Sequence, residues 1–134
     1  MKDKIFSAWA KAEDSNGVQH YVTIVGKLSQ RKKRKAVSED TLVEYGRNSL
    51  TEAVLLYDIK ELERTLTIGM SICHPDDEFN EKEGIKVALR KINNGNFIGQ
   101  LTTSDVTMLT KDAVMAEIIV KLDHVSKNID KYLP

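Results

Sequence analysis

The sequence has 134 residues, which suits one domain over residues 1–134 and is long enough to bury a core without disulfides or metal. Lysine and arginine together number 20, as do aspartate and glutamate, so the chain lacks the excess positive charge of a general nucleic-acid coat protein. Its one cysteine, Cys73, excludes an internal disulfide, and the first residues contain no long apolar stretch, so we expect a cytoplasmic protein without signal peptide or membrane span.

The first part of the chain is predicted to form an N-terminal antiparallel sheet of about five strands within residues 4–73. Residues 4–13 and 18–28 flank Asn16-Gly17, a strong hairpin signal, so these two strands should pair. Shorter strands are predicted over 41–46 and 52–61. The clearest strand is 64–73, in which large apolar residues at even positions alternate with small or polar residues at odd positions. We expect the small face to be open to solvent or to a ligand.

Two C-terminal helices are predicted, over about 80–93 and 110–131. Asn80 is a good N-cap, Glu83 completes a capping-box-like pair, and the sequence Asn-Asn-Gly at 93–95 should end the first helix. An apolar stripe from Met115 to Leu133 marks the second helix. Strands first and helices last indicate an α+β fold. Because a small sheet should not cover the whole stripe, we expect a homodimer or higher homo-oligomer.

Residues 71–84, SICHPDDEFNEKEG, gather the side chains that could carry chemistry. Cys73, His74, Asp76 and Asp77 are too close in sequence to converge easily on one ion, and no second cysteine or histidine stands at a usual zinc spacing. Acids before a helix are expected for capping and dipole reasons alone. No motif for a nucleophile and its base is recognisable, so we expect no metal, no cofactor and no enzymatic activity.

Basic residues offer two kinds of anion contact. Arg47, Arg64 and Arg90 stand apart from one another and could grip the phosphate of a small ligand bidentately, although surface salt bridges are the ordinary role of such residues. The only strong basic run follows the second strand and is ordinarily a solvated loop, but it could instead grip nucleic-acid phosphates. Its members are Arg31, Lys32, Lys33, Arg34 and Lys35.

The segment CHPDDEFNEKEGIKVALRK, residues 73–91, resembles a pattern of small phage and prophage proteins: Cys-x-Pro-x-Asp-x-Phe-(Asn/Asp), then glycine, a small-residue helix and a basic residue. The pattern is carried by Cys73, Pro75, Asp77, Phe79, Asn80, Gly84, Ala88 and Arg90. The expected architecture is also similar to that of the Thoeris anti-defence type 1 sponge proteins. Members of that group dimerise through C-terminal helices and bind a cyclic ADP-ribose isomer without cleaving it.

The resemblance implies a phage-derived, non-enzymatic protein that binds and sequesters a nucleotide-derived immune signal in the host cytoplasm. Arg90 lies inside the motif and is the first candidate for ligand binding, with Arg47 and Arg64 as further candidates. Phe79 and Asn80 are expected to fix the start of the helix, and the Phe79 ring could stack on a base. The basic run and the polar segment 94–107 depart from the pattern. Two alternatives stay open: a nucleic-acid-binding phage accessory protein that uses residues 31–35, and a structural virion component.

Overall fold

The computed structural model describes residues 3–34, 60–105 and 108–133. Within these ranges four strands form one antiparallel sheet in the order β1-β2-β3-β4, made of β1 (Lys4–Glu13), β2 (Gln19–Arg34), β3 (Lys60–Cys73) and β4 (Gly99–Thr103). Helix α3 (Glu81–Asn93) separates β3 from β4, and α4 (Lys111–Lys127) and the short α5 (Ile129–Tyr132) follow β4. The predicted α+β class is confirmed, with four described strands in place of about five.

The predicted hairpin joins β1 to β2. Gly17 takes the positive φ of 80° that such a turn requires of a residue without a side chain. The carboxylate of Asp14 stabilises the turn, because its Oδ1 accepts hydrogen bonds from the backbone N–H groups of Asn16 (2.8 Å) and Val18 (2.9 Å). The two strands then pair over their whole common length, from Glu13↔Gln19 to Lys4↔Leu28.

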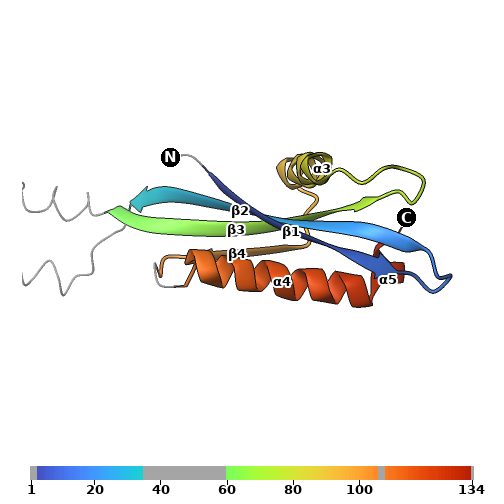
Figure 1. The fold of residues 1–134 in the computed structure, drawn as a ribbon. Helices are drawn as coiled ribbons and strands as arrows, with labels where there is room; N and C mark the ends of the chain where they lie inside the picture. Colours follow the sequence, from blue (N-terminus) through green and yellow to red (C-terminus); the bar gives the residue numbers. More distant parts are fainter. Residues whose placement is uncertain (1–2, 35–59, 106–107, 134) are drawn as a thin grey trace, which may run out of the picture.

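Helices cover both faces of the sheet: Figure 1 shows α3 above it and α4 below it. The face toward α4 carries the larger core, to which β2 and β3 contribute Val22, Ile24, Leu66 and Ile68. Alternate residues of a strand point to opposite faces, so this set agrees with the predicted alternation of residues 64–73. The other side of this core consists of Leu109, which precedes α4, and of the helical residues Val114, Ile118, Leu122, Val125 and Ile129.

The small face of β3 is not open along its length, because α3 packs on it. Val25 of β2 forms a second, smaller core there with Ala88 and Ile92 of α3. The helix comes close because Gly69 has no side chain: a Cβ at this position would lie 2.5 Å from Cγ1 of Ile92. The expectation of an open face is therefore wrong around Gly69, since a glycine in a strand can mark a close approach of another element rather than an exposed surface.

The order of elements also departs from strands first and helices last. Strand β4 lies within the segment 94–107 that we expected to be merely polar, and it pairs with β3 from Ile68↔Gly99 to Arg64↔Thr103. Five residues with one large apolar side chain give too little alternation to predict a strand. The strand predicted over 41–46, and all of 52–61 except its last two residues, lie outside the described residues.

The sheet covers more of the C-terminal apolar stripe than we expected. Ile118, Leu122, Val125 and Ile129 are buried against it. The large apolar residues of α4 that are exposed are Ile119 and Val120, whose exposed fractions are 51% and 61%. We expected a dimer because a small sheet should leave part of the stripe uncovered. For the buried positions this reason is wrong, because the sheet covers them. No described helix is both long enough and apolar enough to span a membrane.

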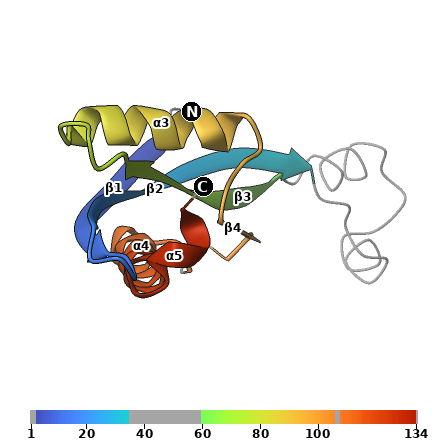
Figure 2. The ribbon, with the colours of Figure 1, turned by 90° about the vertical axis from the view of Figure 1, so that its right-hand side faces the viewer.

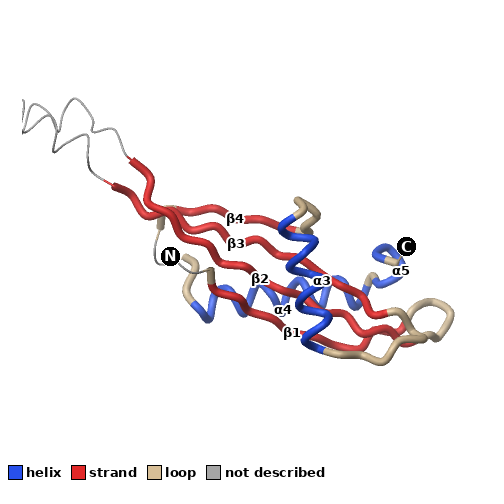
Figure 3. Tube along the Cα trace, turned by 90° about the horizontal axis from the view of Figure 1, so that it is seen from above, coloured by secondary structure: helices blue, strands red, loops and turns tan. Residues whose placement is uncertain are grey.

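Beyond β1 and β4, β2 and β3 continue as a two-stranded extension, which Figure 2 shows reaching past the helices. This part, from Arg31↔Glu63 to Arg34↔Lys60, is called the β2–β3 ribbon below. Arg31, Lys32, Lys33 and Arg34 thus belong to a strand and not to the solvated loop that we predicted, while Lys35 lies outside the described residues. Figure 3 shows the ribbon at one end of the sheet, and the turn between β3 and α3 at the other.

Candidate functional site

The turn from β3 into α3 has the shape that its sequence predicts. The backbone N–H of Asp77 donates to the carbonyl of His74 (3.0 Å) and closes the turn after Pro75. Asn80 is the N-cap of α3, and its Oδ1 accepts a hydrogen bond from the N–H of Glu83 (3.2 Å). The acids at the start of α3 therefore stand where capping and the helix dipole favour them.

An aromatic cluster attaches this turn to the sheet. The ring of Phe79 stacks on that of Tyr21, with centroids 4.4 Å apart and planes 5° apart. Trp9 packs against Phe79 at 4.9 Å and is 43% exposed, and the Nζ atom of Lys11 lies 5.4 Å from the centre of the Tyr21 ring. One face of Phe79 is thus already occupied by Tyr21, and the cluster holds the turn in place over β1 and β2.

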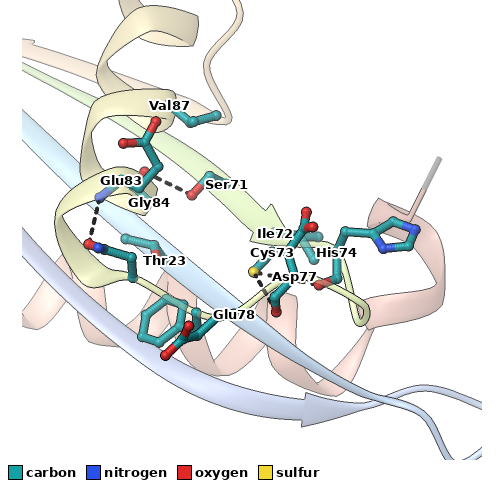
Figure 4. A pocket seen from close by; sticks show the side chains of 12 residues that line it. Thr23, Ser71, Ile72, Cys73, His74, Asp77, Glu78, Glu83, Gly84 and Val87 are labelled. Atoms are coloured by element: carbon teal, nitrogen blue, oxygen red, sulfur yellow. Dashed lines mark hydrogen bonds between the residues drawn. The ribbon is translucent and has the colours of Figure 1, made fainter.

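A pocket of about 410 Å³ lies between the end of β3, the turn and the first turns of α3 (Figure 4). We call it the β3–α3 pocket. Its walls combine one aromatic ring, hydroxyl groups from the sheet and carboxylates from the turn and the helix. The lining residues are Thr23, Ser71, Ile72, Cys73, His74, Asp77, Glu78, Phe79, Asn80, Glu83, Gly84 and Val87.

The floor of the pocket is polar and tightly built. Ser71 donates its hydroxyl hydrogen to the carbonyl of Gly84 (2.8 Å), which ties α3 to β3. A Cβ at Gly84 would lie 2.6 Å from Oγ1 of Thr23, so only glycine lets the helix come this close to β2. Thr23 and Ser71 face each other in the ladder and both are buried. The sheet therefore presents two neighbouring hydroxyl groups beneath the start of the helix.

The pocket is acidic. Asp77, Glu78 and Glu83 line it and are exposed, and no lysine or arginine is among the described residues of its wall. Carboxylates accept hydrogen bonds and attract positive charge, while they repel phosphate at close range. The pocket itself therefore suits a ligand that donates hydrogen bonds through hydroxyl or amino groups.

Cys73 lines the pocket as a thiol. Its Sγ contacts the carbonyl oxygens of His74 (3.6 Å) and Asp77 (3.8 Å). Burial, followed by the negative charge of Asp77, raises the pKa of Cys73, so the thiol stays protonated at neutral pH. A protonated thiol is a poor nucleophile and a poor metal ligand. Within the described ranges, no three histidine, cysteine or acidic side chains are grouped so that they could hold a metal ion.

The structure brings together only some of the predicted ligand residues. Phe79 and Asn80 line the β3–α3 pocket, and Arg90 is exposed on α3. Positions 83, 87 and 90 follow the spacing of one helix face, so Arg90 shares a stripe with Glu83 and Val87 and lies about 10 Å along the helix axis from Glu83. Arg47 lies outside the described residues.

Arg64 is on the opposite face of the sheet, at a second pocket of about 160 Å³. We call this the α4 pocket, since it lies beside the first residue of α4. The Arg64 side chain is held by Gln30 (Nε to Oε1, 3.1 Å) and by the carbonyl of Leu109 (Nη1 to O, 3.3 Å). The pocket is lined by Lys4, Phe6, Leu28, Gln30, Arg64, Leu109, Thr110 and Lys111.

The basic run lies in the β2–β3 ribbon, which begins one residue beyond Gln30 and Arg64 of the α4 pocket and at the other end of the sheet from the β3–α3 turn. Arg31 pairs with Glu63 across the ribbon, with Nη2 2.7 Å and Nε 2.8 Å from Oε1 of Glu63. Arg31 thus has an ion-pair partner within the protein. Lys32, Lys33 and Arg34 follow it along β2. The nucleic-acid alternative that uses residues 31–35 stays a prediction.

Sequence reasoning missed several residues that build the β3–α3 pocket. Thr23 was not singled out, and Gly84 was recognised only as a member of the phage-protein pattern, because their meeting depends on how α3 lies on the sheet. The alternation of β2 places Thr23 on the same face as Tyr21, and this was the only signal available for it. Glu83 was recognised, but only as part of a helix cap.

Comparison with known protein families, curated proteins and solved structures finds no match in any of the three. The kinds of ligand that the two pockets suit are therefore inferred from the side chains that line them. Carboxylates and hydroxyl groups dominate the β3–α3 pocket, and cations dominate the α4 pocket.

Proposed function

We propose that the protein binds a small ribonucleotide-type ligand in the β3–α3 pocket and holds it without converting it. The observation that carries the proposal is the composition of this pocket, in which an aromatic ring, two hydroxyl groups and three carboxylates surround about 410 Å³. This volume is within the range of small-molecule sites, roughly 300–1,000 Å³. The turn, the sheet and the helix that form it are tied together by hydrogen bonds and ring stacking.

The nucleoside part of such a ligand suits the acidic wall. Carboxylates accept hydrogen bonds from ribose hydroxyl groups, as an acidic residue does in dinucleotide-binding sites. Glu83 and Asp77 line the pocket and are the proposed acceptors, and the hydroxyl groups of Thr23 and Ser71 are the proposed further partners. A pocket with three acids and no cation on its wall is unsuited to the phosphates, which would have to project outward.

Arg90 is the proposed partner of these phosphates. It lies on the stripe of α3 that continues from Glu83 through Val87, and its guanidinium has no ion-pair partner among the described residues. A guanidinium grips phosphate oxygens bidentately, which a lysine cannot do. The stripe would thus offer a carboxylate for ribose at one end and a cation for phosphate at the other.

The side chains of the pocket support binding without catalysis. Cys73 is protonated, and its described contacts are carbonyl oxygens rather than a base. His74 is exposed, and its Nδ1 accepts from the N–H of Asp76 (3.2 Å). A nucleophile aligned with a base is therefore not found among the described lining residues, although nucleophilic catalysis depends on such a pair.

The resemblance of residues 73–91 to phage proteins supports an anti-defence role for this binding. We propose that the ligand is a nucleotide-derived immune signal of the cyclic ADP-ribose type, and that a phage-encoded protein sequesters it in the host cytoplasm. We also propose self-association through the exposed apolar residues of α4, Ile119 and Val120.

Calorimetry of the parent protein and three variants against adenosine, ADP-ribose and cyclic ADP-ribose tests the proposal. Glu83→Gln keeps the helix shape but removes the charge, and should weaken all three ligands by about tenfold, the effect of one lost charge-assisted hydrogen bond. Arg90→Ala should weaken only the two ligands that carry phosphate. Arg34→Ala, in the ribbon, is the matched control and should change none of them.

The proposal fails if none of the three ligands binds the parent protein. If Arg34→Ala weakens binding and Arg90→Ala does not, the nucleic-acid alternative takes its place, and binding of single-stranded DNA should then fall steeply with added salt. Mass spectrometry of each ligand after incubation tests the non-enzymatic part, because a converted ligand would contradict it.

A further inference from the structure

Cations from three separate elements converge on the α4 pocket. Lys4 is the first residue of β1, Arg64 belongs to β3, and Lys111 is the first residue of α4. Figure 3 shows the start of β1 and the start of α4 at the same end of the sheet. The described lining contains no aspartate or glutamate. This pocket is therefore opposite in character to the β3–α3 pocket, and lies on the other face of the sheet.

The two lysines are not neutralised within the described part of the chain. Neither Lys4 nor Lys111 has an ion-pair partner there. The Arg64 guanidinium donates to Oε1 of Gln30 and to the carbonyl of Leu109, which fix it at the wall. Like charges that face one pocket repel one another, and a bound anion removes this repulsion. The positive end of the 17-residue helix α4 adds to the same potential.

We propose that the α4 pocket binds one small oxyanion of the phosphate type. Its volume of about 160 Å³ is below the range of sites for drug-sized ligands, so it suits one phosphoryl group and not a nucleoside. Phe6 and Leu28 form an apolar wall that limits competition from water, while Lys4, Lys111 and Arg64 supply charged donors. The phosphoryl group can come from inorganic phosphate or from a phosphate monoester. The inference goes beyond the proposed function and involves none of its residues.

Isothermal calorimetry and thermal unfolding of the full chain in inorganic phosphate test this site, with chloride at equal ionic strength as the reference. Phosphate should raise the melting temperature above that in chloride, because a ligand that binds only the folded state stabilises it. Lys4→Gln and Lys111→Gln should each weaken phosphate binding by about tenfold, as expected for one lost charge-assisted hydrogen bond. Lys86→Gln removes an exposed lysine from α3 and should leave phosphate binding unchanged.

The inference is overturned if phosphate stabilises the protein no more than chloride does, or if Lys86→Gln weakens binding as much as Lys111→Gln. Competition with ribose 5-phosphate distinguishes the sources: displacement of phosphate assigns the site to a monoester, and no displacement assigns it to the free ion. Adenosine binding, which tests the β3–α3 pocket, should be the same in the parent protein and in both lysine variants. The two proposals can therefore fail independently.

Discussion

At the scale of single residues, Asp14 stabilises the β1–β2 turn through several hydrogen bonds. Its Oδ1 accepts the N–H groups of Asn16 and Val18, and its Oδ2 accepts a hydrogen bond from Nε2 of His20 at 2.8 Å. The Nδ1 atom of His20 is buried and has no partner among the described residues, so the ring donates through Nε2. One carboxylate thus closes the β1–β2 turn and accepts the hydrogen bond of one nitrogen of a buried ring.

Asp14→Asn should destabilise the protein in a pH-dependent way. The hydrogen bond from His20, and then that from the N–H of Val18, lower the pKa of Asp14 below its usual value of 3.8. A lowered folded-state pKa stabilises the fold fully above the unfolded-state pKa, and the stabilisation is lost as the pH falls through the folded-state pKa. Urea unfolding should therefore show a lower free energy of unfolding for the variant at pH 7 and a narrowing difference below about pH 4.

Asp123→Asn is the control for this comparison, because the ion pair of Asp123 within the described residues is an exposed one with Lys127 on α4. Its effect on stability should be small at every pH. A difference between Asp14→Asn and the parent protein that stayed constant from pH 7 to pH 3 would contradict a role for the Asp14 charge.

At the scale of elements, α3 can pack closely on the sheet because two positions are glycines, which have no side chain. Gly69 and Gly84 stand where the helix crosses β3 and β2, and at both positions a Cβ would meet a neighbour at less than 3.0 Å. The neighbour at Gly69 is Ile92 in the small core, and the neighbour at Gly84 is the buried, β-branched Thr23. Two glycines therefore set the distance between the helix layer and the sheet.

Gly69→Ala should displace α3 and destabilise the protein by about 1–3 kcal/mol, the usual effect of overpacking. Alanine alone would favour a strand slightly over glycine, so the loss measures the contacts with Ile92 and with the carbonyl oxygen of Ala88. Gly99→Ala is the matched control in β4, because a Cβ there would meet only the flexible Lys121 side chain at 3.4 Å. In urea unfolding, Gly69→Ala combined with Ile92→Ala should cost less than the sum of the single changes.

The same elements show what the sequence predicts and what it does not. The alternation of β3, the Asn80 cap and the end of α3 at Asn94 and Gly95 are local signals, and the structure confirms each of them. The covering of the small face by α3 depends on contacts between Gly69 and Ile92, which are far apart in sequence. Strand β4 exists because β3 offers it a partner, and not because its five residues favour a strand.

The residues of the β3–α3 pocket likewise divide into those that the sequence predicts and those that it does not. Phe79 and Asn80 could be predicted, since they lie next to one another in a recognisable turn. Thr23 could not be predicted, because its position in the pocket depends on its pairing with Ser71 and on where α3 packs on the sheet. The separation of Arg64 from Phe79 by the thickness of the sheet also followed only from knowing which face each strand residue occupies.

At the scale of the whole molecule, the exposed surface of α4 bears on assembly. Ile119 and Val120 are adjacent on the helix and more than half exposed, whereas Ile118 beside them is fully buried. A contiguous exposed apolar patch can serve as an interaction surface, and these two residues are the candidates for one on α4. A second copy of the chain is the partner that we propose for them.

Ile119→Asp and Val120→Asp should each convert a dimer into a monomer and leave the melting temperature of the monomer nearly unchanged, because both side chains point away from the core. Ile118→Asp should instead prevent folding, since it places a charge in the large core. Sedimentation velocity and far-ultraviolet circular dichroism distinguish the two results. A parent protein that stays monomeric at every accessible concentration would contradict the dimer.

The unequal cores on the two faces of the sheet imply an order of local opening. Eleven buried residues of the described chain form the core under α4, and three form the core under α3. Sub-global opening begins where the fewest apolar contacts are lost, so the amide hydrogens of α3 should exchange with deuterium before those of α4. A nucleotide held against α3 would slow exchange on that face alone, and an oxyanion at the start of α4 would slow it on the other.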